Sequence, residues 1–142
     1  MITYANIAKL QLVQNSLAGL VTGKPRFDHI TPVLYELHWL PVSYRIAYKL
    51  ATITHKTLST AQPAYLFTCL HRYQPSRTLR SATHNRLTLP DIRNYRTDFS
   101  HRGFSNSAPT IWNNLPADLT DTVISRDVFA KRLNSPLPTC LR

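Results

Sequence analysis

The sequence contains little glycine and little cysteine, and it has no long hydrophobic run. Three glycines are too few for the glycine-rich loops that cradle phosphate groups in nucleotide-binding enzymes. Cys69 and Cys140 lie far apart and follow no leader peptide, so we expect free thiols rather than a disulfide-stapled secreted domain. The apolar stretch 7–21 is interrupted by Lys9 and three amides, which excludes a membrane span. We therefore expect an intracellular protein, nuclear or cytoplasmic, that is not secreted and has no membrane partner.

Acidic residues are also scarce. Seven Asp and Glu face seventeen Lys and Arg, which leaves a formal charge of +10. Such a surplus attracts polyanions, either nucleic acid or an acidic membrane surface, over roughly one Debye length. The alternative is that the charge merely keeps a small protein soluble. With 142 residues, 43% of them hydrophobic, the chain is long enough for one small core, and one domain is expected.

Catalytic motifs are missing as well. No Gly-x-Ser-x-Gly string is present, and the acid pair Asp118 and Asp121 lacks the third acid that a two-metal site requires. A zinc site would have to be assembled from Cys69, His71 and His84 with Cys140 or His101. Structural zinc ligands normally come in close Cys-x-x-Cys pairs, which do not occur here. The sequence therefore predicts no catalytic residue, no metal and no cofactor.

Helical periodicity dominates the first half of the chain. Ile7, Leu10, Val13, Leu17 and Leu20 recur at steps of three and four residues and predict a helix that Gly23 ends. A second helix is expected to start at Thr31 as N-cap, with Pro32 in its first turn, and to run towards Trp39 before Pro41. A third is expected from about Ser43. Its predicted core-facing stripe consists of Val42, Ile46, Leu50 and Ile53.

Three more segments have helical signals. Pro63 fits the first turn of a short helix that carries Tyr65, Leu66, Cys69, Leu70 and Tyr73, whose aromatic spacing favours core packing. The segment 104–115 is expected to anchor through Phe104, Ile111, Trp112 and Leu115, with a helix starting near Pro109. A last helix should begin at Ser125 as N-cap, with Asp127 in its first turn. Its inward residues are predicted to be Val128, Phe129 and Leu133.

The predicted fold class is mainly α: a small helical domain of about five short helices with an extended basic arm or small β element at about 74–103. In the arm, arginines accumulate and regular apolar periodicity fades. Residues 86–89 are its candidate strand. The predicted parts are a helical scaffold (1–73), the arm (74–103), a C-terminal helical segment that packs on the scaffold (104–135) and a frayed tail (136–142).

Two groups of cations are candidates for binding nucleic acid. Arg45, Lys49 and Lys56 fall within about 40° of one another on a helical wheel, which fits either an edge that follows phosphates or an ordinary solvated face. The second group interleaves with aromatic residues such as Tyr73 and Tyr95. It consists of Arg72, Arg77, Arg80, Arg86, Arg93, Arg96 and Arg102. Arginine engages phosphates bidentately and aromatics stack on single strands, whereas a disordered basic linker is the alternative.

Five strings together resemble the region after the polymerase core in the reverse transcriptase protein of LINE-type, non-LTR retrotransposons. They are LQLVQNSLAGLVTG (10–23), FDHITPVLYELHWLPVSYRIAYK (27–49), PSRTLRS (75–81), FSNSAPTIWNNLP (104–116) and FAKRL (129–133), in the family's order. The family's full protein copies RNA into DNA at a nicked target, with an endonuclease domain and palm aspartates that this sequence lacks. Gly19 departs from the family pattern, where a basic side chain is usual.

The resemblance implies a truncated, non-catalytic piece of that protein, with RNA or DNA as a partner held through backbone contacts. Two alternatives stay open. The apolar helix faces would serve to dock on a reverse transcriptase core, or the chain is a non-functional relic of a decayed element. The binding hypothesis predicts a steep dependence on salt, whereas the docking hypothesis predicts exposed apolar patches and self-association.

Overall fold

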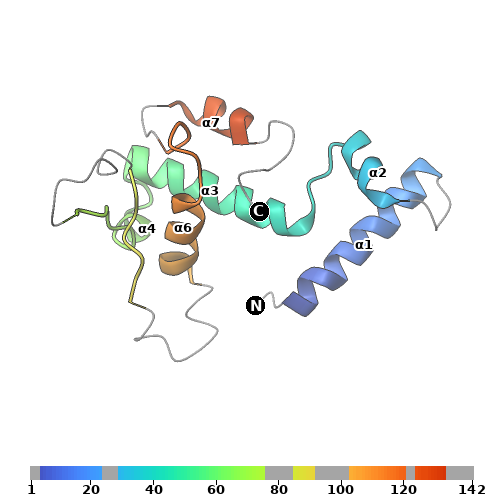
Figure 1. The fold of residues 1–142 in the computed structure, drawn as a ribbon, viewed down its shortest axis with the longest axis horizontal. Coiled ribbons are helices and arrows are strands. Elements are labelled where there is room, and N and C mark those ends of the chain that lie inside the picture. The colour runs from blue at the N-terminus through green and yellow to red at the C-terminus, as the bar shows by residue number, and fades with distance from the viewer. Residues whose placement is uncertain (1–3, 24–28, 76–84, 92–102, 121–123, 134–142) are drawn as a thin grey trace. The chain divides into compact units, whose positions relative to one another are not determined.

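The structure is a computed structural model, and it describes residues 4–23, 29–75, 85–91, 103–120 and 124–133. This part of the chain is mainly helical, which confirms the predicted fold class. Its helices (Figure 1) are α1 (Tyr4–Thr22), α2 (Ile30–Glu36), α3 (Val42–Thr60), α4 (Ala64–Phe67), α6 (Phe104–Asn113) and α7 (Arg126–Leu133). Within these ranges no helix combines the length and apolarity that crossing a bilayer requires.

The chain divides into two compact units, Met1–Ile46 and Ala47–Arg142, so that the boundary falls inside α3. The boundaries expected from composition at residues 73, 103 and 135 stay predictions. In the first unit, α1 and α2 lie side by side (Figure 1). Ala18 on α1 is completely buried against Val33 and Leu34 of α2, because its small side chain lets the two helices approach closely.

Two amides on α1 hold the chain that follows α2. Gln14 donates from Nε2 to the Leu40 carbonyl at 2.9 Å, and Gln11 Oε1 accepts from the Val42 N–H at 2.9 Å. Val42 is the first residue of α3, where backbone N–H groups have no partner inside the helix. Gln11 therefore satisfies a donor that α3 itself leaves unpaired.

The ends of α1 and α2 test several sequence predictions. Gly23 follows α1 with φ +64, which confirms that a left-handed glycine ends this helix. The predicted start of α2 is wrong, because the helix begins at Ile30 with His29 in the N-cap position and without a side-chain cap. Pro32 is thus the third helical residue, a first-turn position where a missing N–H costs no hydrogen bond.

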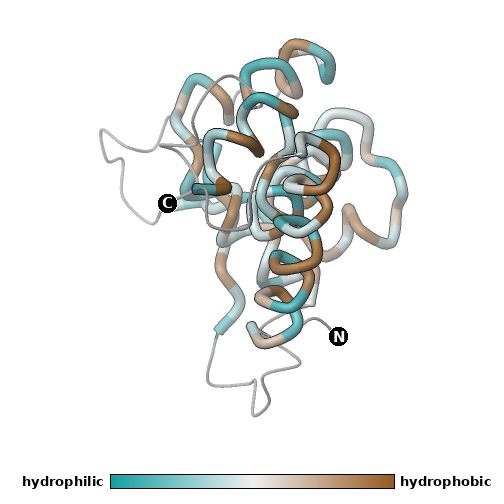
Figure 2. Tube along the Cα trace, turned by 90° about the vertical axis from the view of Figure 1, so that its right-hand side faces the viewer, coloured by the Kyte–Doolittle hydropathy of each residue, from teal (hydrophilic) through white to brown (hydrophobic). Residues whose placement is uncertain are grey.

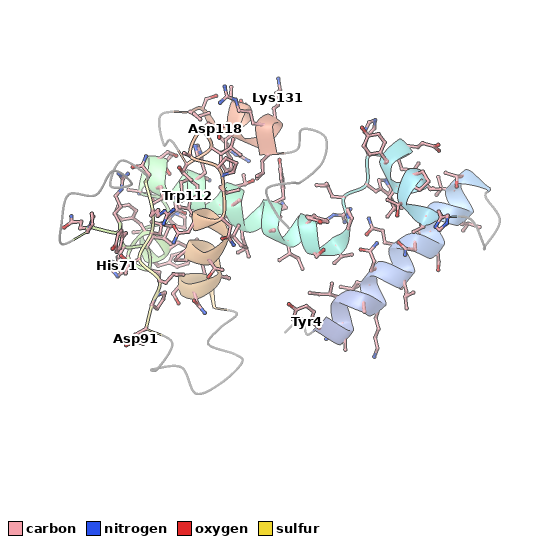
Figure 3. The ribbon with its side chains drawn as sticks, viewed as in Figure 1. Tyr4, His71, Asp91, Trp112, Asp118 and Lys131 are labelled. Atoms are coloured by element: carbon pink, nitrogen blue, oxygen red, sulfur yellow. The ribbon has the colours of Figure 1, made fainter. Side chains whose placement is uncertain are left out.

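The second unit is built around Trp112 of α6 and Phe129 of α7, both completely buried. The cluster around them contains Ala51, Leu70, Leu87, Ala108, Leu115 and Leu119. Trp112 and Phe129 lie with ring centroids 6.2 Å apart. In Figure 3, Trp112 is placed between α6 and α3. These rings fill the space that α3, α6 and α7 share.

The predicted core-facing stripe of α3 is wrong. Ile53 is 39% exposed, and Val42, Ile46 and Leu50 are only partly buried. The residues that α3 buries are Ala51, Thr54, His55 and Thr57. At 100° per residue, Ile53 lies about 160° from Ala51, almost on the opposite side of the helix. Trp112 and Phe129 arrive from other helices, and α3 packs against them with the small Ala51 and with the His55 ring.

Helix α6 also begins earlier than predicted. It starts at Phe104, directly after Gly103, so that Pro109 lies inside the helix and not near its start. An interior proline removes one backbone hydrogen bond and crowds the preceding turn. Here the proline ring is fully buried, and this packing offsets part of that cost.

Helix α7 follows its prediction except at one residue. The Val128 N–H donates to Ser125 Oγ at 3.5 Å, and Asp127 lies in the first turn, so the predicted N-cap at Ser125 is confirmed. Phe129 is buried and Leu133 packs against the core, as expected. Val128 is 41% exposed, so its predicted inward position is wrong.

Candidate nucleic-acid interface

The structure describes half of the predicted binding residues. Arg77, Arg80, Arg93, Arg96 and Arg102 lie outside the described residues. The other five are all exposed: Arg45, Lys49, Lys56, Arg72 and Arg86. They fall into two places, the outer side of α3 and a pair of extended segments in the second unit.

On α3, the boundary between the two units separates Arg45 from Lys49 and Lys56. The two lysines are seven residues apart, and at 100° and 1.5 Å per residue they lie on one side of the helix, about 10 Å apart along its axis. That side is about 150° from the buried Ala51. Lys49 and Lys56 therefore form a short cationic edge, while Arg45 belongs to the other unit.

The helix that Pro63 was expected to start is shorter than predicted. It ends at Phe67, and Tyr73 lies beyond it in an extended segment. Tyr65 is 71% exposed and Tyr73 is 53% exposed, so the prediction that these aromatics pack in the core is wrong. The buried residue that follows α4 is Leu70.

Residues 71–73 pair with residues 86–88 in a short antiparallel arrangement, defined here as the ribbon. Arg72 is bridged to Leu87. The Tyr73 N–H donates to the Arg86 carbonyl at 2.9 Å, and the Thr88 N–H donates to the His71 carbonyl at 2.8 Å. The expected strand at 86–89 does not form as a strand: within the described residues it is reduced to one bridge at Leu87, whose partner Arg72 lies outside the predicted arm. Figure 3 labels His71 on the first segment.

The ribbon presents one face to the core and one to solvent. Leu87 is 2% exposed and belongs to the core cluster. Because side chains alternate along extended chain, the neighbours of Leu87 and the residues opposite them point away from the core. These outward residues are His71, Tyr73, Arg86 and Thr88, and all four are exposed. Tyr73 and Arg86 stand directly opposite each other, which places their Cβ atoms about 5 Å apart.

Asn113, near the end of α6, fixes the ribbon to the helix. Its Nδ2 donates to the Leu87 carbonyl at 2.8 Å, and its Oδ1 accepts from the Leu87 N–H at 2.9 Å. One amide side chain therefore pairs both backbone groups of a residue that solvent barely reaches. Figure 1 shows the 85–91 segment, in yellow, running beside α6.

Two more bonds hold the same segment. Trp112 Nε1 donates to the Asn85 carbonyl at 2.7 Å, and Asn85 Nδ2 donates to the Thr120 carbonyl at 3.3 Å. Sequence reasoning missed Asn85 and Asn113 as positioning residues. The sequence does contain a signal for the Trp112 bond: a buried indole N–H almost always requires a hydrogen-bond acceptor.

A shallow hollow lies next to Arg86. Arg86, Asn113, Leu115, Ala117 and Thr120 line it, and its volume is about 90 Å³. Pockets that bury a small-molecule substrate are roughly 300–1,000 Å³. The hollow is therefore too small for such a substrate, although it leaves space beside the Arg86 side chain.

His55 has the chemistry of an acid–base group but the position of a core residue. It is 1% exposed and stacks on Phe129 with ring centroids 4.3 Å apart. Burial lowers the pKa of His55 below the ordinary value of 6.5, and the backbone of Ile124 opposes this shift weakly. Neither ring nitrogen has a hydrogen-bond partner of good geometry. A ring enclosed in this way cannot exchange protons with a substrate.

The part of the chain that the structure describes contains no candidate metal-binding site. There, no three His, Cys, Asp or Glu side chains come close enough to hold a metal ion. Cys69 is a free, exposed thiol that donates to the Tyr65 carbonyl at 3.2 Å. His84, His101 and Cys140, which the zinc alternative needs, lie outside the described residues.

Comparison with models of known protein families, with curated proteins and with solved structures gave no match.

Proposed function

We propose that this chain is a non-catalytic nucleic-acid-binding piece of a LINE-type reverse transcriptase protein, from the region after the polymerase core. It contacts template RNA or target DNA through the sugar–phosphate backbone. For this function it acts in the nucleus or the cytoplasm, where those nucleic acids occur. The family assignment rests on the five collinear strings, and the binding function rests on the placement of the cations.

The observation that carries the binding function is that two exposed arginines lie on the ribbon, Arg86 on its outward face and Arg72 on the other face, opposite Leu87. Arg72 and Arg86 come from segments more than ten residues apart, yet hydrogen bonds between those segments bring them onto one short element. Both side chains are exposed, and Asn113 fixes the segment that carries Arg86. A guanidinium group on a fixed backbone loses less freedom when it engages a phosphate bidentately.

The size of the electrostatic effect is measurable. Each phosphate that a single strand exchanges for a protein cation contributes about 0.7 to the slope of log K against log salt. If the five predicted binding residues that the structure describes each engage one phosphate, affinity should fall about 100-fold between 50 and 200 mM salt. Participation of all ten predicted residues would raise this to roughly 10,000-fold.

The test is a titration of the full chain with single-stranded RNA, single-stranded DNA and duplex DNA at both salt concentrations. Arg72→Gln combined with Arg86→Gln should weaken binding and lower the salt slope by about 1.4. Lys131→Gln with Arg132→Gln is the matched control, because it removes two exposed charges from α7. A flat salt profile, or equal loss in both double variants, contradicts the proposal.

The exposed side of α1 favours a second candidate, docking on a reverse transcriptase core. Figure 2 shows apolar residues recurring along α1, which starts near the end marked N. Six of them remain exposed by 46–79%: Leu10, Leu12, Val13, Leu17, Leu20 and Val21. An apolar strip of this extent typically marks a contact surface.

The docking candidate predicts that the chain alone binds a hydrophobic dye and self-associates. Val13→Gln with Leu20→Gln should reduce both effects, whereas Leu89→Gln, at a position 53% exposed in the other unit, should not. A monodisperse monomer with no dye binding argues against docking.

A further inference from the structure

We propose that the ribbon recognises single-stranded nucleic acid, with one unpaired base stacked on the Tyr73 ring while the Arg86 guanidinium engages the adjoining phosphate. This inference rests on the proposed function and adds the strandedness of its ligand. The ligand is an unpaired nucleotide, which single-stranded RNA and single-stranded DNA both present.

Tyr73 has the properties of a stacking platform. Its side chain is 53% exposed, while its backbone N–H is tied to the Arg86 carbonyl at 2.9 Å. The residue therefore combines an accessible ring with a constrained main chain. A tyrosine ring has only two rotatable side-chain angles, so ordering it on a ligand costs little entropy.

Charge is placed beside this ring. Arg86 stands directly opposite Tyr73 on the outward face, with Cβ atoms about 5 Å apart. The base and the phosphate of one nucleotide are separated by a single sugar, so neighbouring side chains of these lengths can reach both groups. His71 and Thr88 are exposed on the same face and add hydrogen-bonding groups. None of these four residues carries a carboxylate.

The preference for single-stranded over duplex nucleic acid follows from how accessible the faces of the bases are. In a duplex the faces of each base are covered by its neighbours, and a base can meet Tyr73 only after it leaves the stack, at a free-energy cost. In a single strand the faces are available, and every base has one, so no sequence preference is needed. The Arg86 contact is open to both forms, because both expose phosphates.

The experiment measures binding of labelled single-stranded RNA, single-stranded DNA and a duplex of the same sequence by fluorescence anisotropy at 50 mM salt. Tyr73→Ala should weaken binding of the single strands by roughly 5- to 150-fold and leave duplex binding within about twofold. Tyr73→Phe keeps the ring and should bind like the parent chain. Tyr65→Ala is the matched control, since Tyr65 is 71% exposed in the same unit and belongs to α4, not to the ribbon.

The salt slope separates stacking from a general structural role. Tyr73→Ala should leave the slope unchanged, whereas Arg86→Gln should lower it by about 0.7. Thermal melting by circular dichroism identifies any variant that has lost its fold. If Tyr73→Ala does not fold, Tyr73→Phe is compared with Tyr73→Leu, which keeps an apolar side chain but has no aromatic ring for a base to stack on.

The outcomes distinguish the two proposals. If no nucleic acid binds, the proposed function fails. If single strands and duplex bind equally, or Tyr73→Ala and Tyr65→Ala lose the same affinity, the stacking inference is overturned while backbone binding stands. Selective loss of single-strand binding in Tyr73→Ala supports it, and comparison of the RNA and DNA arms identifies the preferred strand.

Discussion

Asn113→Ala tests how the ribbon is held. The substitution removes both hydrogen bonds that the Asn113 amide makes with Leu87, at 2.8 and 2.9 Å. The Leu87 N–H and carbonyl are then left without their partners in a residue that is 2% exposed. Alanine is smaller than asparagine and fills the position without a clash, so the main change is the loss of these two bonds.

The expected loss follows from the burial. A buried backbone group left unsatisfied costs about 1–3 kcal/mol, so two such groups predict a loss of about 2–6 kcal/mol in the free energy of unfolding. A domain of ordinary stability has only about 5–15 kcal/mol in total. Asn113→Ala should therefore shift the unfolding midpoint markedly.

The assay is equilibrium unfolding in urea, followed by tryptophan fluorescence. Trp39 lies in the first unit and Trp112 in the second, so a Trp39→Phe background isolates the signal of the unit that contains Asn113. Asn114→Ala is the control, because Asn114 is exposed and adjacent; a change within about 0.5 kcal/mol is expected there. Equal stability of the two variants would refute the reasoning.

Three further predictions concern packing and pH. Phe129→Ala should destabilise the second unit by about 3–5 kcal/mol in the same unfolding assay, whereas the exposed Val128→Ala should not. Ala18→Leu should cost about 1–3 kcal/mol by overpacking the contact of α1 with α2, measured by thermal melting against Ala8→Leu at an exposed position of α1. Burial lowers the pKa of His55, so as pH falls through 6.5 the unfolded chain takes up the proton first and stability decreases; His55→Leu should flatten a plot of stability against pH below 6.5.

The ribbon and the core depend on the same helix. Trp112 buries its ring in the core and donates from Nε1 to the Asn85 carbonyl, while the next residue, Asn113, holds Leu87. Two consecutive residues of α6 therefore join the packing of the second unit to the segment that presents Arg86. A core substitution that shifts α6 should consequently also weaken nucleic-acid binding, if the proposed function is correct.

Several features of this protein are local, and the sequence by itself determined them. Gly23 ends α1 because a residue without a Cβ takes a positive φ at little cost. Ser125 starts α7 because its hydroxyl accepts from a first-turn N–H. The exposure of Arg45, Lys49, Lys56, Arg72 and Arg86 was predictable in the same way, since unpaired cations are rarely buried.

The tertiary structure decided what depends on residues far apart along the chain. The buried side of α3 follows from where Trp112 and Phe129 arrive, because Ala51 and the His55 ring pack against them. The pairing of Tyr73 with Arg86 depends on a register that Leu87 and Asn113 set together. Spacing within one segment cannot reveal such a register, because shifting it by one residue would turn every outward side chain of the ribbon toward the core.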